Sequence, residues 1–327
     1  MRLRPLIIGA VAAGLSGCLL ASPSVADEPQ AQPQHALSSI DMSSRSPLSD
    51  SAKQALAARA DRGDLEAIYR LASNALRTDG PIYGRGHWGN PREAEMWWRR
   101  AAALGDPKAM ILLGHFYAEP WGVPQDLLEA AKWFQLAADK DQLKAVQALA
   151  ALYMGEWSDE RDDDQASIWL HRAADMGDDH AKLLIALRYD AGWGVREDAR
   201  EAAIWYRRVI STVKPPVVTE DQSIALNNLG VIYEKGRGVP ADDAAAAAFY
   251  RQAGADFNLA RLCESGRGVA QDRAGALWLY RQVALFSDTP EVDQALKRLG
   301  YVRSDQEAEA GEILDHDRQK AKTTCDP

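Results

Sequence analysis

Two groups of side chains have a spacing that could bind a metal ion or transfer a proton. His115 and Glu119 are four residues apart, which on a helix would let them share a metal ion or a proton. The run at 159–164, DERDDD, offers carboxylates but lacks the alternating ligands and central glycine of a calcium loop. Two ligands do not make a metal site. We therefore interpret the first as a solvated ion pair and the second as a solvated turn in which Asp162 caps a helix.

A Gly-Arg-Gly sequence at 236–238 could instead cradle a phosphate. A nucleotide-binding loop occurs once, after a buried strand, and opens a helix at its third glycine. This stretch recurs along the chain, so its meaning comes from a repeat. The signatures His-Glu-x-x-His, Gly-x-Ser-x-Gly and Cys-x-x-Cys do not occur. We predict a protein that is not an enzyme and has no cofactor, no metal and no catalytic residues.

Aromatic pairs mark the repeat. They lie at 97–98, 133–134, 169–170, 205–206, 249–250 and 279–280, the last two with Phe or Leu first, and the first four are 36 residues apart. A second series keeps the same intervals, with alanine at i, leucine at i+4 and tyrosine at i+8, as in Ala109, Leu113 and Tyr117. These residues share one face of a helix, helix A, and a small residue at i+5 lets a neighbouring helix approach.

A second helix, helix B, follows in each repeat. Gly192, Gly236 and Gly266 come three residues after the tyrosine position, where a left-handed residue can end helix A. A residue with a good N-cap side chain precedes every aromatic pair: Asn90, Asp126, Asp162, Asp198, Asp242 and Asp272. Each repeat is therefore predicted to be a helical hairpin that buries its apolar faces by stacking on its neighbours.

The pattern A-x-x-x-L-G-x-x-Y-x-x-G-x-G-V-x-x-D-x-x-x-A-x-x-W-Y resembles the Sel-1-like repeat, a relative of the tetratricopeptide repeat, over residues 63–285. The resemblance implies an all-α fold, an α/α superhelix (solenoid) of about six repeats with helical caps. It also implies an adaptor that holds other proteins. Three departures stand out: Gly-Glu-Trp-Ser at 155–158 replaces the glycine pair, 211–223 is an insertion, and six residues are missing after residue 253.

The first residues of the chain suggest export. A basic start, an apolar stretch and Ser24-Val25-Ala26 form a signal peptide, whereas Leu15-Ser16-Gly17-Cys18 resembles a lipobox with Cys18 lipidated. Both processing routes remain open. The predicted boundaries are an export signal at 1–26 (or 1–17 for a lipoprotein), a flexible linker at 27–50, a repeat array with an N-terminal cap helix at 51–285, and C-terminal capping helices and a tail at 286–327. The expected location is the periplasm, or the outer membrane through a lipid anchor.

Charge and cysteine content restrict the partners. The net charge is −9 without a basic stripe, so nucleic acid is not an expected partner. After Cys18 only Cys263 and Cys325 remain. They either form a disulfide in an oxidising compartment, or Cys263 is a small buried residue and Cys325 a tail thiol.

Two sets of residues are candidates for partner binding. By resemblance to tetratricopeptide arrays, a groove is lined by helix A, at Tyr69, Ile111, His115, Gln147, Leu183, Asn227, Val231, Phe257 and Arg261. The turn position between or in place of the two glycines forms a second set, an aromatic strip of Arg85, Trp121, Trp157, Trp193, Arg237 and Arg267. The groove could equally bind nothing strongly, and each strip tryptophan could fold over its neighbour's turn to shield the edge.

Three functions follow from these candidates. The first is a non-enzymatic envelope adaptor that mediates protein–protein interaction. The second is a saccharide-binding accessory factor for exopolysaccharide or cell-wall assembly, because tryptophan faces stack on sugar rings. The third is a β-lactam hydrolase, by resemblance to cysteine-rich relatives, although this chain lacks their paired cysteines.

Overall fold

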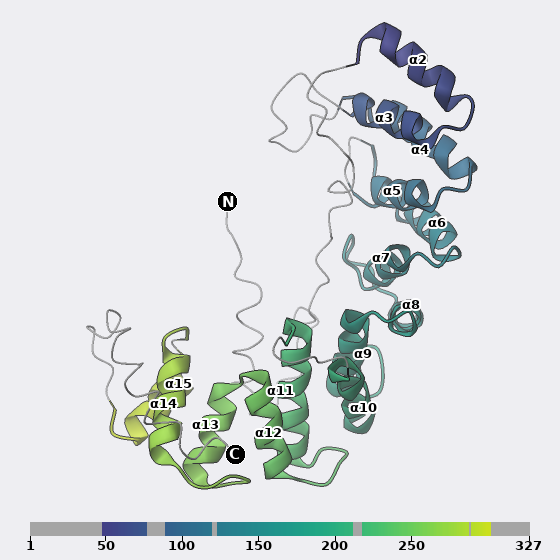
Figure 1. Ribbon diagram of the computed structural model, residues 1–327. Coiled ribbons are helices and arrows are strands. Elements are labelled where there is room, and N and C mark those ends of the chain that lie inside the picture. Colours follow the sequence, from purple (N-terminus) through teal and green to yellow (C-terminus); the bar gives the residue numbers. More distant parts are fainter. Residues whose placement is uncertain (1–47, 77–88, 120–122, 212–217, 288, 302–327) are drawn as a thin grey trace. The chain divides into compact units, whose positions relative to one another are not determined.

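The computed structural model describes residues 48–76, 89–119, 123–211, 218–287 and 289–301. Within these ranges the chain forms fourteen α-helices and no β-strand (Figure 1). The described residues divide into two compact units, one within residues 28–181 and one within residues 182–327. We describe each unit by itself. The predicted all-α helical-repeat class is confirmed.

The first unit contains seven complete helices. They are α2 (Asp50–Ala60), α3 (Leu65–Ala75), α4 (Pro91–Ala103), α5 (Pro107–Ala118), α6 (Leu127–Ala138), α7 (Leu143–Tyr153) and α8 (Asp163–Asp175). Consecutive helices pack against one another, as the hairpin α5–α6 shows (Figure 1). The helix α9 (Asp179–Ala191) contains the boundary between the units.

The second unit continues the pattern. Its helices are α10 (Ala199–Ile210), α11 (Glu220–Lys235), α12 (Asp243–Ala253), α13 (Asp256–Ser265), α14 (Arg273–Ala284) and α15 (Pro290–Arg298). The helices α11 and α12 lie side by side and form the most extensive pairing (Figure 1). Odd-numbered helices from α3 to α13 are the predicted helices A, and even-numbered helices from α4 to α14 are the predicted helices B.

All six predicted N-caps are confirmed. Each side chain accepts a hydrogen bond from a free backbone amide in the first turn of its helix B. The distances are 3.1 Å at Asn90, 2.9 Å at Asp126, 3.0 Å at Asp162, 2.9 Å at Asp198, 2.9 Å at Asp242 and 2.9 Å at Asp272. The left-handed glycines are also confirmed, because φ is +72° at Gly192, +64° at Gly236 and +71° at Gly266.

The small residue on helix A serves the purpose that its position predicted. A Cβ atom on Gly114 would lie 2.4 Å from the ring of Phe134, and one on Gly230 would lie 2.4 Å from the ring of Tyr250. The second aromatic residue of helix B therefore rests directly on the backbone of helix A. Phe134 and Tyr250 are fully buried as a result. Most side chains of the aromatic pairs belong to the core, while Trp133 and Phe249 are half-buried.

The departures from the repeat have local consequences. Where six residues are missing, α12 ends at Ala253, Gly254 adopts φ +66°, and α13 begins at Asp256. The chain therefore passes from α12 to α13 through only two residues, as the missing residues require. The helix α2, capped by Ser49, occupies the predicted position of the N-terminal cap. Within the described residues no helix is long and apolar enough to cross a membrane.

Several predictions fall on residues that the structure does not describe. They are the export signal at 1–26, the lipobox at Cys18, nearly all of the linker at 27–50, the core of the insertion at 212–217, and the part of the C-terminal capping region and tail beyond residue 301. Arg85, Trp121 and Cys325 also lie outside the described ranges.

Candidate partner-binding surface

Four predicted groove residues come together in the second unit. Asn227 and Val231 lie on α11, and Phe257 and Arg261 lie on α13; all four side chains are half-buried. We call these four residues the α11–α13 surface. The amide of Asn258 donates a 2.9 Å hydrogen bond to Asn227, which joins the two helices beneath the surface. Two successive helices A thus present an amide, a guanidinium and two apolar side chains together.

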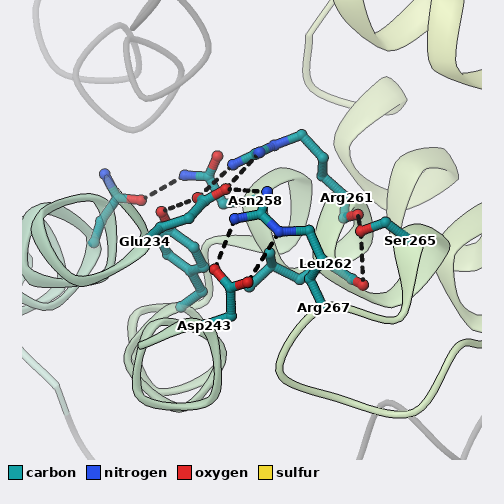
Figure 2. A network of polar contacts seen from close by, with 9 residues as sticks. Glu234, Asp243, Asn258, Arg261, Leu262, Ser265 and Arg267 are labelled. Carbon is teal, nitrogen blue, oxygen red and sulfur yellow. Dashed lines mark hydrogen bonds and ion pairs between the residues drawn. The ribbon is translucent and has the colours of Figure 1, made fainter. Parts of the chain in front are cut away.

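An ion-pair network holds Arg261 in place (Figure 2). Its two terminal nitrogens donate to the two carboxylate oxygens of Glu234, at 2.7 and 2.6 Å. Arg267 donates to the same carboxylate at 3.1 Å and to Asp243 at 3.0 and 2.7 Å. The Glu234 side chain is only 7% exposed, whereas the two arginine side chains are 41% and 44% exposed. The carboxylate therefore lies inside and the guanidinium groups lie at the surface.

The network also determines the ionisation of Glu234. Burial acts to raise the pKa of this carboxyl, but the hydrogen bonds and charge of Arg261, with help from Tyr250 and Arg267, hold the pKa below its ordinary value. The Tyr250 hydroxyl donates to Glu234 at 2.9 Å. Burial and the adjacent carboxylate raise the pKa of Tyr250. Glu234 is thus ionised and Tyr250 protonated at neutral pH, which keeps both guanidinium groups fixed.

The same arrangement recurs in the neighbouring repeats, and the sequence analysis missed it. An acidic residue follows the tyrosine position of helix A, a tyrosine of helix B donates to it, and an arginine from the next repeat pairs with it. The three sets are Asp190, Tyr206 and Arg237; Glu234, Tyr250 and Arg267; and Glu264, Tyr280 and Arg298. The constant separation of 16 residues between acid and tyrosine was the available signal.

The turn residues contact the preceding repeat. Arg237 reaches back to Asp190 at 3.0 Å, and Arg267 reaches back to Glu234. The Trp157 ring stacks on Phe134 with ring centroids 6.1 Å apart, and its indole nitrogen is buried. At Trp157 this contact agrees with the shielding alternative, whereas the Arg237 and Arg267 side chains pair with the preceding repeat and stay 32% and 44% exposed. Trp193 is half-buried.

The groove residues of the first unit have different surroundings. The Tyr69 hydroxyl donates to Asp106 of the next repeat, and Gln147 donates to Asp178 of the next repeat at 2.9 Å. Ile111 is half-buried. Tyr69 and Gln147 therefore link successive repeats while keeping part of their surface accessible.

Two groove candidates are not at the surface. His115 is 9% exposed because it lies against the rings of Phe134 and Trp157, and Leu183 is 2% exposed in the core. The interpretation of His115 and Glu119 as a solvated pair is also wrong. Their Nδ1 and Oε1 atoms are 3.2 Å apart, but the side chains are 11% and 18% exposed because the turn at 155–158 covers them.

The remaining candidate chemistry is sparse in the described part of the chain. Asp162 caps α8, as predicted. Among the described residues, no three His, Cys, Asp or Glu side chains are placed to hold a metal ion. Cys263 is fully buried and disulfide-bonded. The α11–α13 surface combines the amide of Asn227 and the guanidinium of Arg261 with two half-buried apolar side chains, and the Phe257 ring lies at 5.4 Å from that of Tyr280.

Comparison with known proteins identifies the family of this repeat. The Sel1 repeat model matches six segments, at 65–106, 107–142, 144–178, 180–208, 223–256 and 254–285. A solved structure of c5321, described as a protective antigen present in uropathogenic Escherichia coli strains and displaying an SLR fold, is 28% identical with a TM-score of 0.55; the match covers 82% of this chain and 56% of that protein. A Sel1 repeat protein from Oxalobacter formigenes is 27% identical with a TM-score of 0.49, over 70% of this chain and 94% of that one. No protein of curated function matches by sequence. Because the six matched segments cover well over half of its length, the chain belongs to the Sel1 repeat family.

Proposed function

We propose that this protein is an exported adaptor that holds a partner protein on its helices A, with the α11–α13 surface as the principal contact. Sel1 repeat proteins generally mediate protein–protein interaction. The observation that supports this surface is that the half-buried Val231 and Phe257 pack against the same core cluster. On the same two helices, hydrogen bonds hold Asn227 and Arg261 in position. Apolar anchors with fixed polar neighbours are typical of binding hot spots.

The export part of the proposal rests on the first 26 residues. Their basic start, apolar stretch and small residues before Asp27 are typical of an exported protein. Metabolic labelling with a fatty acid, followed by cell fractionation, distinguishes the two processing routes. Label that disappears in Cys18→Ser supports the lipoprotein. Unlabelled protein in the periplasm supports cleavage after Ala26, and protein that stays in the cytoplasm refutes export.

A photo-crosslinking amino acid at position 227 tests the partner surface. The control carries it at Gln252, an exposed position on α12 in the same unit. We expect a discrete protein adduct in envelope extract from position 227 and none from position 252. Equal labelling at both positions would count against a specific surface.

Affinity for the captured partner provides the second readout. Val231→Ser removes an apolar contact and should weaken binding about tenfold, on the order of one hot-spot side chain. Gln252→Ser should leave the affinity unchanged, and both variants are checked by thermal melting. Competition by free oligosaccharide would favour a glycan partner instead. At Trp157 the ring stacks on Phe134 and the side chain is half-buried, which leaves less of its aromatic surface for a sugar ring than an exposed tryptophan would offer.

A further inference from the structure

The turn at 155–158 brings a carboxylate into the joint between two repeats of the first unit. By sequence phase, Glu156 occupies the position of the first turn glycine, which is Gly236 in a later repeat. Its Oε1 atom is buried and has no hydrogen-bond partner within the described part of the chain. A buried carboxylate oxygen without a donor is costly when it is charged. The contact between these two repeats therefore contains an ionisable side chain at a position where a later repeat has an uncharged glycine.

The groups that face Glu156 increase this cost. Glu119, at the C-terminal end of α5, is the charged group that acts on it, and Glu119 is hydrogen-bonded to His115 at 3.2 Å. Three residues after the turn, the guanidinium of Arg161 donates to Asp163 at 3.1 Å. Trp157, the next residue after Glu156, lies against His115, and His115 in turn is bonded to Glu119, so the charge of Glu119 acts on Glu156 at this contact between the repeats.

The turn is held closed by aromatic and polar contacts. The Trp157 ring stacks on Phe134 at an interplanar angle of 21° and meets the edge of His115 at 5.9 Å. The side-chain amide of Gln125 donates to the carbonyl oxygens of Trp157, at 3.0 Å, and Ala118, at 2.8 Å. Trp157 is next to Glu156 in the chain, so a movement of the carboxylate moves the ring.

We propose that the turn at 155–158 is a pH-sensitive latch between the α5–α6 and α7–α8 repeats. With Glu156 protonated, the turn stays closed and Trp157 stacks on Phe134. With Glu156 ionised, its charge opposes that of Glu119 inside the joint, and the turn moves outward with Trp157. Opening exposes the Phe134 ring and loosens the contact between the two repeats. This inference does not depend on the proposed adaptor function.

The direction of the pH response follows from the ionisation of Glu156. Burial, and then the charge of Glu119, raise the pKa of Glu156 from its ordinary value of 4.5 to about 7. A raised pKa means that the closed form binds the proton more tightly than the open form does. The stabilisation of the closed latch is therefore complete below about pH 4.5 and is lost as the pH rises through about 7.

Fluorine NMR of the full chain labelled with 5-fluorotryptophan tests the latch. The chain has ten tryptophans, and the Trp157 signal is assigned by its loss in Trp157→Phe. We expect this signal to titrate between pH 5.5 and 8.5 with a midpoint near 7, and Glu156→Gln to abolish the titration. Glu160→Gln, which changes an exposed carboxylate two residues after the turn, is the matched control and should leave the titration intact.

Two further variants keep the test decisive. Glu119→Gln removes the charge that acts on Glu156 and should lower the pH midpoint of the Trp157 titration. This variant tests the proposal even if Glu156→Gln does not fold. His115→Asn separates the histidine from the carboxylate as the source of the signal. A Trp157 signal that does not titrate in the wild type, that titrates unchanged in Glu156→Gln, or that stops titrating only in His115→Asn, would overturn the proposal.

Discussion

Replacing Gly268 by alanine tests how closely one repeat approaches the next. Gly268 is the second glycine of its turn, with φ +67°, and a Cβ atom there would lie 2.2 Å from the carbonyl carbon and 2.3 Å from the carbonyl oxygen of Asp243. It would also lie 2.4 Å from the amide nitrogen of Ala244. All three atoms belong to the backbone at the start of α12, so no side-chain rotation can relieve the overlap.

Gly254 provides the matched control. Its φ is +66°, nearly the same as at Gly268, but a Cβ atom there would meet nothing within 4 Å. Both substitutions place alanine in the left-handed region, which costs about 1–2 kcal/mol. Only Gly268→Ala adds overpacking, which costs about 1–3 kcal/mol more. We expect a loss of about 1–2 kcal/mol for Gly254→Ala and about 2–5 kcal/mol for Gly268→Ala.

Urea unfolding followed by circular dichroism measures the difference. The free energies of unfolding are compared by linear extrapolation, provided that the denaturant slope is unchanged between variants. Equal losses for the two variants would refute the direct contact between the turn and α12. The contact also explains the second glycine of the motif, because the first glycine ends helix A and the second admits the neighbouring repeat.

Three other changes test separate parts of the fold. Trp205→Ala truncates a side chain that is 7% exposed and should lower the free energy of unfolding by about 3–5 kcal/mol in urea, so a variant that melts like the parent would contradict its place in the core. Asp242→Ala removes the acceptor for the Ala245 amide and should lower the thermal midpoint at a cost of about 1 kcal/mol, whereas Asp242→Asn should retain most of the stability. Burial raises the pKa of Asp256 from 3.8 to about 6. Protonated Asp256 therefore stabilises the folded state; this contribution is fully present below about pH 3.8 and is lost as the pH rises through 6. Between pH 4 and 7 the urea midpoint of Asp256→Asn should accordingly fall less than that of the wild type. If the two midpoints fall in parallel with pH, Asp256 does not contribute to the pH dependence of stability.

The ion-pair networks affect the interpretation of binding measurements on variants of the α11–α13 surface. Arg261 contributes to the α11–α13 surface and also neutralises the buried Glu234. Its removal would leave a buried carboxylate with less compensation, which is strongly destabilising. Loss of binding in an Arg261 variant would therefore not identify a contact. Val231 balances no buried charge and is the better probe, and because it packs against the core its variant is compared by thermal melting as well.

The disulfide of Cys263 affects experiments under reducing conditions. Cys263 is fully buried within the last repeats, while Cys18 and Cys325 lie outside the described residues. Pairing with Cys325 stays a prediction, and peptide mapping without reduction identifies the partner. Unfolding measurements are best made on protein whose oxidation state has been determined in this way.

The amino-acid sequence was sufficient for the repeat architecture because each of its signals is local. Asp242 caps α12 through an amide three residues away, and Gly236 ends α11 through its own backbone conformation. Gly230 was predicted to admit a neighbour because only a small residue recurs there, and the ring of Tyr250 occupies that space. The period of the apolar residues, the capping residues and the left-handed glycines are read from one or two turns of chain.

Only the tertiary structure decided which side chains pair across repeats and which ones are exposed. The spacing of His115 and Glu119 indicated a helical pair, but their burial depends on the turn at 155–158, some forty residues later in the chain. Likewise, the position of Trp157 indicated an exposed turn, whereas its ring stacks on Phe134. The physical reason is that a residue's position along the repeat determines its helix face, while its contacts with the next repeat depend on side-chain rotamers and on the distance between two stacked hairpins.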